Sequence, residues 1–380
     1  SVETMSTKSV EMFNEFYSTQ KELESKINAL KPSIALEQPE VYREVSDLSH
    51  EQARQLHSVR QKLSLEDWND LIQSLHGHPF HKNILLQSSF IRNAFVKKYG
   101  YAGDKDLMMM ICNQTDYGAS NYSILKNRVY LQLPAAEAVR QRVNSLYRLL
   151  TQLPAGTSVL NLACGPALEL SMLLQDDNFK THQFDLIDHD INTIRYVNCT
   201  INNRQVYPYL GNALRIIKGD YRILSPRKFL QHTCKPSIDF TGLRKIFVPL
   251  KYKSGLIKLN HYDLIYSAGL FDYIRSDSPS QNKGASALVR RLFDCLKPGG
   301  QLIIGNYLSE SDFNLHKGYH RTMMEAYSEW ILLYRTSEEI IEFTSDLPSS
   351  SYSLKILNEY FEDNATNHNG VIGFLVITKN

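Results

Sequence analysis

A short turn of small residues at 163–167 is the part of this chain best suited to hold a ligand. The apolar run Val159–Leu162 predicts a buried strand, and Ala163, Gly165 and Ala167 follow it before an apolar helical stretch begins. A backbone with so little side-chain bulk can come close to a ligand, and the amides at the start of the helix are unpaired donors. This arrangement suits a nucleotide-like ligand at the C-terminal end of the first strand of an open α/β sheet. The alternative is a buried strand with an ordinary turn.

A carboxylate follows the next predicted strand. Gln183–Ile187 has the apolar character of a second buried strand and leads directly into Asp188. A carboxylate at a strand end, about 20 residues beyond a glycine turn, can accept hydrogen bonds from both hydroxyls of a ribose. Asp190 is better explained as the cap of the following helix. The turn and Asp188 together predict a nucleoside site.

The spacing of the small residues indicates which class of nucleoside cofactor the site would bind. They do not follow the G-x-G-x-x-G spacing of NAD enzymes, and no Lys-Ser or Lys-Thr follows as in a phosphate loop. The positions Asn161, Ala163, Gly165 and Ala167 instead resemble motif I of class I S-adenosylmethionine (SAM) methyltransferases, roughly Asp-x-Gly-x-Gly-x-Gly. This resemblance implies a Rossmann-like α/β sheet of seven strands with the last one antiparallel. It also implies SAM as the cofactor and S-adenosylhomocysteine (SAH) as its product.

Further strand candidates follow in the order that such a sheet requires. Val206–Leu210 is the third, and Tyr262–Tyr273 contains the fourth strand and its exit loop. We expect Leu296–Gly300 to be a turn that leads into the fifth strand. Two β-rich runs at 353–361 and 370–378 surround a polar turn, as expected for the closing hairpin of the sheet. The agreement of order and spacing supports the fold class.

The resemblance also assigns candidate site residues. Asp188 would bind the ribose, and Asn212 would meet the adenine unless it only serves turn chemistry. The loop Gly100–Asp104 would close over SAM or form an ordinary turn. The full set of cofactor candidates is Tyr101, Asp104, Ala163, Cys164, Gly165, Pro166, Asp188, His189, Asn212, Ala213, Ser267, Ala268 and Gly269.

Three residues are candidates for the acceptor side of the site. Asp272 and Tyr273 follow the fourth strand, where Asp272 could act as a base, orient a donor or make a structural hydrogen bond. Arg335 could clamp a substrate carboxylate with its planar fork, or form a surface salt bridge. Asn306 and Tyr307, at the exit of the fifth strand, are weaker candidates. No metal ligands are expected, because the histidines lack metal-ligand spacing.

Motifs spread over residues 78–336 resemble a narrower bacterial group of class I methyltransferases. This group includes the synthases of 3-hydroxypalmitic acid methyl ester, a quorum signal. The resemblance implies O-methylation of the carboxylate of a small or acyl-chain acid, such as a 3-hydroxy fatty acid. Lys98 departs from the group, which has a proline there. The matching residues are Lys97–Asp104, Pro134–Arg142, Leu162–Glu169, Ser267–Tyr273, Met324, Glu325, Trp330, Tyr334 and Arg335.

Two other functions stay open at this point. The chain could methylate a protein or another macromolecule, with the helical half and a basic insertion as docking surfaces. It could also be a regulatory protein that binds SAM without turnover, because only Gly165 of the motif I glycines is present.

The composition sets broad bounds. A chain of 380 residues with 43% hydrophobic and 22% charged residues is typical of a globular protein, and its net charge of +2 gives no general affinity for nucleic acid. We find no apolar run long enough for a membrane span and no signal peptide. The five scattered cysteines are interpreted as free thiols in a reducing cytoplasm. The expected partner is a small or acyl substrate, and a homo-oligomer remains open.

The organisation of the chain changes near residue 150. Apolar spacing predicts helices over 8–30 and Pro134–Leu153, and Ser64 starts another helix with Trp68 on its apolar face. We therefore predict a helical N-terminal region, 1–150, acting as a substrate lid, and a SAM-binding domain, 151–380. Residues 218–260 resemble an insertion with ten Lys or Arg against two Asp. This insertion is either a solvated excursion or a basic flap that attracts an anionic substrate, an acidic partner or a membrane surface.

Overall fold

The protein was analysed as a computed structural model, which describes residues 2–176, 182–201, 203–226, 252–276, 284–309, 319–363 and 370–380. The chain divides into two compact units. The helical unit comprises Ser1–Arg140 and Leu315–Ile331, and the sheet unit comprises Gln141–Asn314 and Leu332–Asn380. Much of the predicted basic insertion, residues 227–251, lies outside the described ranges.

The helical unit confirms that the N-terminal part of the chain is helical. In α4 the Ser64 hydroxyl accepts a hydrogen bond from the amide of Asp67 at 3.1 Å, and Trp68 and Leu71 are buried, as predicted. Its elements are α1 (Val2–Asn28), α2 (Pro32–Glu37), α3 (Pro39–Arg60), α4 (Leu65–His76), η1 (Phe80–Ile84), η2 (Leu85–Gln87), α5 (Ser89–Val96), α6 (Lys105–Asn113), α7 (Asn121–Leu131), α13 (Tyr319–Ser328) and the first part of α8 (Pro134–Thr151).

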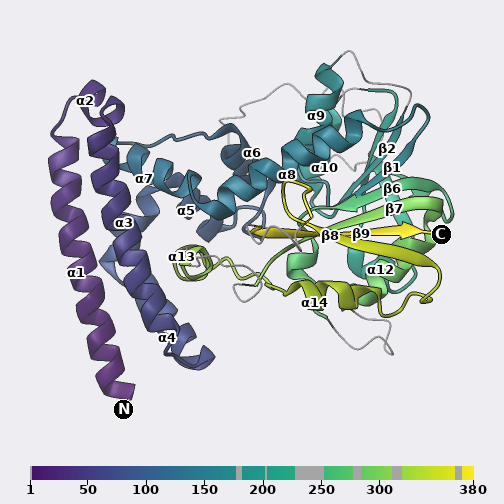
Figure 1. The fold of residues 1–380 in the computed structure, drawn as a ribbon. Helices are drawn as coiled ribbons and strands as arrows, with labels where there is room; N and C mark the ends of the chain where they lie inside the picture. Colours follow the sequence, from purple (N-terminus) through teal and green to yellow (C-terminus); the bar gives the residue numbers. More distant parts are fainter. Residues whose placement is uncertain are drawn as a thin grey trace. The chain divides into compact units, whose positions relative to one another are not determined.

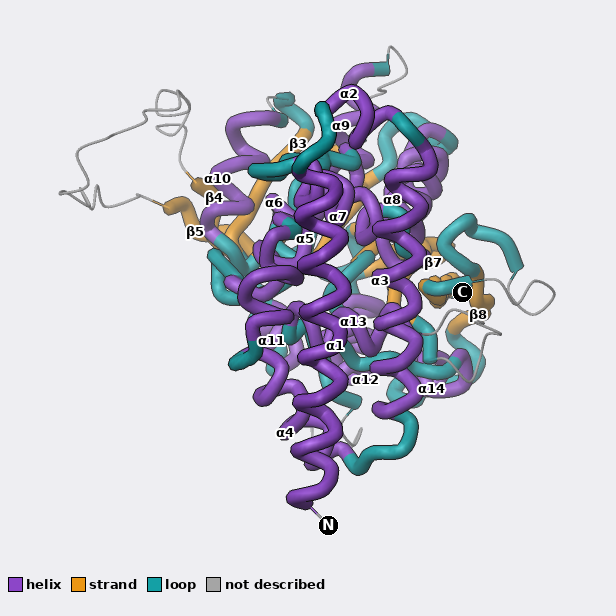
Figure 2. Tube along the Cα trace, turned by 90° about the vertical axis from the view of Figure 1, so that its left-hand side faces the viewer, coloured by secondary structure: helices purple, strands orange, loops and turns teal. Residues whose placement is uncertain are grey.

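Helix α13 reaches the helical unit from a late part of the chain. It packs against α3, α4 and α5 (Figure 2). Its buried Glu325 lies 3.2 Å from Arg60 and accepts a hydrogen bond from the Trp68 indole at 3.0 Å. His57 is 2.8 Å from the hydroxyl of Thr322. The helical unit is thus completed by residues that the sequence had placed with the 151–380 domain.

The sheet unit holds one sheet of nine strands in the order β5-β4-β3-β2-β1-β6-β7-β9-β8 (Figure 1). The pairs of β1 with β2, β1 with β6, β2 with β3 and β6 with β7 are parallel, whereas β9 runs antiparallel to β7. The strands are β1 (Ser158–Leu162), β2 (Gln183–Asp188), β3 (Val206–Leu210), β4 (Arg222–Pro226), β5 (Tyr252–Leu256), β6 (Tyr262–Ser267), β7 (Leu296–Tyr307), β8 (Tyr352–Leu357) and β9 (Ile372–Lys379).

All seven predicted strands are present, and the antiparallel last strand confirms the methyltransferase-like fold class. Helices α9 and α10 lie on one face of the sheet, and α12 lies on the other (Figure 1). The remaining elements of this unit connect the strands. They are α9 (Leu168–Gln175), α10 (Ile191–Thr200), α11 (Ala213–Ile217), η4 (Phe271–Tyr273), α12 (Gly284–Asp294), α14 (Ser337–Ile341), η6 (Glu342–Thr344) and the second part of α8.

Two strands were not predicted. β4 and β5 come from the ends of the basic insertion and pair antiparallel, so they extend the sheet beyond β3. The close approach of β4 requires Gly211, because an added Cβ there would lie 2.8 Å from Ile187 and 3.0 Å from Ile223. The described ends of the insertion are therefore part of the sheet.

Two further expectations need correction. Leu296–Gly300 is not a separate turn, because β7 already begins at Leu296. The pairing of β7 with β6 shifts register between Leu296 and Gln301, and Gly299 in this stretch has a φ of +80°. The cysteines are not all free: Cys112, Cys164 and Cys295 are, but Cys199 is disulfide-bonded. Cys234 lies outside the described residues.

No helix within the described ranges has the length and apolar character needed to cross a bilayer.

A buried histidine makes the helical unit sensitive to pH. His81 is fully buried, its Nε2 is 2.8 Å from the Tyr327 carbonyl, and its ring is 4.6 Å from that of His76. Burial lowers the pKa of His81 from 6.5 to about 4, and the charges of His76 and Lys82 act in the same direction. The folded state therefore binds a proton on His81 less readily than the unfolded state does.

We predict that the helical unit loses stability as the pH falls below 6.5, by about 2 kcal/mol from His81 alone on reaching pH 5. Both tryptophans, Trp68 and Trp330, belong to this unit, so the fluorescence change in urea unfolding reports on it. His81→Gln keeps an N–H donor and should flatten this pH dependence. An unchanged slope in that variant would rule out His81 as its source.

Candidate functional site

The turn after β1 has the conformation that its small residues allow. Ala163, Gly165 and Ala167 all have positive φ, at 58°, 55° and 49°. A left-handed conformation costs an alanine about 1–2 kcal/mol, so the surrounding bonds must hold this turn in place. The Cys164 amide donates to the Ile187 carbonyl at 3.0 Å, and the Ala167 amide donates to Cys164 at 3.1 Å. An added Cβ at Gly165 would meet nothing within 4 Å, so the turn opens onto free space.

Asp188 lies directly beside this turn. Its Oδ2 accepts a hydrogen bond from the Gly165 amide at 3.0 Å, and its Oδ1 accepts one from the Asp190 amide at 3.0 Å. His189 Nδ1 is 3.3 Å from Oδ1, and this hydrogen bond raises the pKa of His189. A carboxylate has about four acceptor positions, so the carboxylate can take a further donor. The structure brings the predicted turn and the predicted carboxylate together.

Asp190 has the capping role expected from the sequence. Its side chain accepts a hydrogen bond from the Asn192 amide at 2.9 Å at the start of α10.

A buried polar cluster supports the turn from below. The Asn161 amide donates to Glu169 and lies 3.1 Å from the Tyr266 hydroxyl, which in turn donates to Glu169 at 2.9 Å. Burial raises the pKa of Glu169. Asn161 occupies the place of the motif I aspartate, and here it connects β1, β6 and α9. Sequence reasoning gave Glu169 and Tyr266 no role, although both lie in or beside the recognised motifs.

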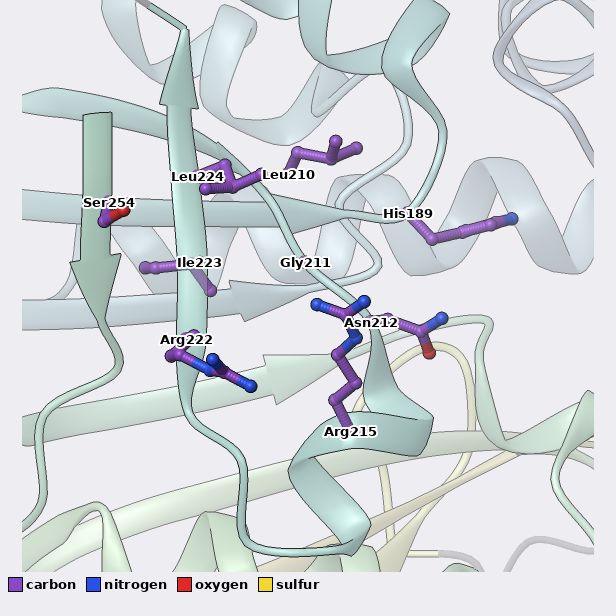
Figure 3. A pocket seen from close by; sticks show the side chains of 9 residues that line it. All are labelled: His189, Leu210, Gly211, Asn212, Arg215, Arg222, Ile223, Leu224 and Ser254. Atoms are coloured by element: carbon purple, nitrogen blue, oxygen red, sulfur yellow. The ribbon is translucent and has the colours of Figure 1, made fainter. Parts of the chain in front are cut away.

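A pocket of about 550 Å³ lies at the ends of β2 and β3. Figure 3 shows Ile223 and Leu224 on β4 beside Leu210 at the end of β3. Asn212 caps α11, because its side-chain oxygen accepts a hydrogen bond from the Leu214 amide at 2.8 Å. Its exposed side chain keeps the amide NH₂ as a donor. The residues that line the pocket are His189, Leu210, Gly211, Asn212, Arg215, Arg222, Ile223, Leu224 and Ser254.

The exit of β6 lies on the other side of β1. The Ser267 hydroxyl donates to the Leu162 carbonyl at 2.8 Å, which joins the ends of β6 and β1. Arg142, from the second part of α8, donates to the Ala268 carbonyl at 3.3 Å. Its guanidinium would lie 3.4 Å from a Cβ at Gly269, so the glycine leaves room for it.

Asp272, in the loop after β6, and Arg335, shortly before α14, are both buried. Asp272 Oδ1 accepts a hydrogen bond from the Tyr307 amide at 2.7 Å, and its carbonyl accepts one from Leu333 at 2.7 Å. Burial raises the pKa of Asp272 to about 6, although Arg142 and Arg335 act in the opposite direction. The neighbouring Tyr273 is 44% exposed and so faces solvent much more than Asp272 does.

Arg335 donates to protein atoms rather than facing solvent. It is 3% exposed and donates to the Phe271 carbonyl and Asn306 Oδ1, both at 2.6 Å. It also donates to the Ile274 carbonyl and, at 3.1 Å, to Ser276. These bonds use most of its donors, so the geometry favours a residue that holds the β6 exit loop over a clamp for substrate.

Two predicted cofactor residues belong to the helical unit. Asp104 caps α6, with its carboxylate accepting a hydrogen bond from the Leu107 amide at 2.9 Å. Burial raises the pKa of Asp104. Tyr101 lies in the loop before this helix. The assignment of both to the cofactor stays a prediction. In the part of the chain that the structure describes, no three His, Cys, Asp or Glu side chains come together as a metal site.

No family model matches the sequence, and no curated protein matches it significantly. Among solved structures, a possible exported protein from Bordetella parapertussis is similar to the chain, with 15% identity, a TM-score of 0.50 and coverage of 89% of this chain and 96% of that one. This similarity shows a shared fold that extends over both units.

Two solved structures described as SAM-dependent methyltransferases are more distant. A TehB-like enzyme from Corynebacterium glutamicum has 13% identity and a TM-score of 0.35, with coverage of 63% and 88% of the two chains. A possible histamine N-methyltransferase from Thermotoga maritima has 12% identity and a TM-score of 0.38, with coverage of 76% and 99%. At these TM-scores the likeness carries no conclusion about activity.

We predict that Arg335→Lys lowers the free energy of unfolding of the sheet unit by about 3 kcal/mol, because a lysine cannot reproduce the fork that holds the loop. Hydrogen exchange at the Leu333 amide should become faster in this variant, since that amide is bonded to Asp272. Arg222→Lys, at an exposed pair with Asp220, is the matched control and should change neither quantity. An equal effect of the two substitutions would contradict the role given to Arg335.

Proposed function

We propose that this protein is a SAM-dependent methyltransferase. The observation that carries the proposal is the bond between the Gly165 amide and Asp188. It places an open, side-chain-free turn next to a buried carboxylate, at the C-terminal edge of a sheet with the expected strand order. Ligands of open α/β sheets bind at this edge.

The residues present fit the adenosyl part of SAM. Asp188 would accept hydrogen bonds from the ribose, and the free space at Gly165 would let the ligand approach the backbone. The pocket beside His189 and Asn212 has apolar walls for a purine and an amide donor at its rim. Ala163, Cys164, Pro166, Ala213, Ser267, Ala268 and Gly269 follow the same strand ends. When bound, SAM supplies a methyl group activated by a sulfonium.

We propose that the acceptor is the carboxylate of a small or acyl-chain acid, such as a 3-hydroxy fatty acid. Motifs shared with the group that makes 3-hydroxypalmitic acid methyl ester support this substrate class. A carboxylate is already ionised at pH 7, so the protein needs only to hold it in line and exclude water. Such positioning can lower the barrier by about 7–11 kcal/mol. The bonds of Asp272 and Arg335 keep the β6 exit loop rigid for this purpose.

The first test concerns binding. We predict that Asp188→Ala weakens SAM and SAH about 30-fold or more, because the ribose loses its acceptor and the turn loses its support. Gly165→Ala should weaken both ligands too, since the added methyl fills the open space. Gly156→Ala is the matched control, because Gly156 also has positive φ and open surroundings. If calorimetry finds the same SAH affinity in the wild type and in all three variants, the turn and Asp188 do not form the SAM site.

The second test concerns the acceptor. With labelled SAM, fatty acids, hydroxy acids and bacterial lysate, we expect label in the lipid fraction. The pKa of Asp272 is about 6, so a reaction that used it as a base would slow below that pH. For a carboxylate acceptor, the rate should instead stay level between pH 6 and 8, and Asp272→Asn should keep turnover. Label in protein or RNA would favour a macromolecular acceptor. The absence of label from every fraction would favour a SAM-binding regulator.

A further inference from the structure

We propose that Asn161 and Glu169 form a hydrogen-bonded bridge across the turn that would hold SAM, and that this bridge works with one negative charge, carried by either residue but not by both. The inference rests on the proposed function and adds two positioning residues to it. It starts from the departure at position 161, where this chain has an amide and the motif I consensus has an aspartate.

The two residues of the bridge lie just outside the two ends of the turn. Asn161 is on β1, two residues before Ala163, and Glu169 is in the first turn of α9, two residues after Ala167. The Asn161 amide donates to Glu169 Oε1 at 3.1 Å, and both side chains are buried. This hydrogen bond therefore closes a loop that contains the strained alanines and Gly165, all with positive φ.

A third side chain ties the bridge to the neighbouring strand. The Tyr266 hydroxyl on β6 lies 3.1 Å from the Asn161 amide nitrogen and donates to Glu169 Oε1 at 2.9 Å. Burial raises the pKa of Glu169, whereas the hydrogen bonds from Tyr266 and Asn161 act in the opposite direction. A hydrogen bond to an ionised acceptor is about twice as strong as a neutral one, so a charge on Glu169 strengthens the bridge.

The turn is thus held by two carboxylates from different elements. Asp188, at the end of β2, accepts a hydrogen bond from the Gly165 amide at 3.0 Å, and Glu169 on α9 joins the ends of the turn through Asn161. Burial raises the pKa of the Cys164 thiol, and the charges of Asp188 and Glu169 act in the same direction. Both charges therefore act on the middle of the turn, which Cys164 occupies.

The geometry explains why position 161 carries an amide in this chain. An aspartate there would bring a second carboxyl group within hydrogen-bond distance of Glu169, and two carboxylates so close cannot both ionise without strong repulsion. If the amide and the carboxylate are exchanged between the two positions, the amide can donate to the carboxylate and to Tyr266, and Tyr266 can donate to the carboxylate. The exchanged pair keeps all three hydrogen bonds and the single charge.

The experiment measures SAH affinity by calorimetry between pH 6 and 9, relative to the wild type at each pH. Asn161→Asp should weaken SAH about tenfold at pH 8 and recover towards pH 6, where the two carboxyl groups share a proton. Glu169→Gln removes the charge and should weaken SAH about tenfold at every pH. The double variant, Asn161→Asp with Glu169→Gln, should return to within about threefold of the wild type throughout.

Asp185→Asn is the matched control. Asp185 also accepts a hydrogen bond from a tyrosine hydroxyl, that of Tyr262 at 2.6 Å, but it lies on β2 outside the turn. This substitution should leave SAH affinity within about twofold of the wild type.

The outcomes distinguish this inference from the proposed function. If the wild type does not bind SAH, the proposed function fails and this inference with it. If the wild type binds SAH, and the single variants match it or the double variant is no better than they are, only the bridge is overturned. If the single variants fail to fold, the double variant decides alone: near-wild-type affinity supports the bridge, and failure to fold contradicts it.

Discussion

The hydrogen bond from the Gly165 amide to Asp188 is the interaction on which the candidate site depends. Parallel pairing of β1 and β2 sets Leu162 opposite Ile187, so the residues that follow each strand emerge side by side. The amide and the carboxylate can then meet, and their hydrogen bond holds both the turn and the Asp188 side chain in place. Two alanines with positive φ are strained, and this charge-assisted bond helps to offset that cost.

The loop at the exit of β6 is held by two buried charged side chains. Here the buried guanidinium of Arg335 donates to main-chain carbonyl groups, and the buried carboxyl group of Asp272 accepts a hydrogen bond from the Tyr307 amide. Each ion satisfies main-chain groups that would otherwise be unpaired in the interior.

The sequence allowed the seven main strands, the turn and Asp188 to be predicted, because each depends on local apolar runs and on residues at strand ends. It did not reveal β4 and β5, since these short strands mix polar with apolar residues, and β5 joins the sheet only through its pairing with β4. The burial of Arg335 could not be predicted from the sequence either. A sequence gives the position of a charge but not the oxygen atoms that will surround it, and those come from two separate segments, the loop after β6 and the end of β7.

The helical unit is discontinuous along the chain, and this has a consequence for folding. Helix α13 lies between β7 and β8 in the sequence, yet it supplies the carboxylate that meets Arg60 and the Trp68 indole. During synthesis the N-terminal helices emerge long before this partner, and domains that are continuous would usually fold first. Here the N-terminal part must wait for the central strands to be made, so its polar groups around the missing helix stay hydrated until late. A nascent chain of this kind offers chaperones a long interval in which to act.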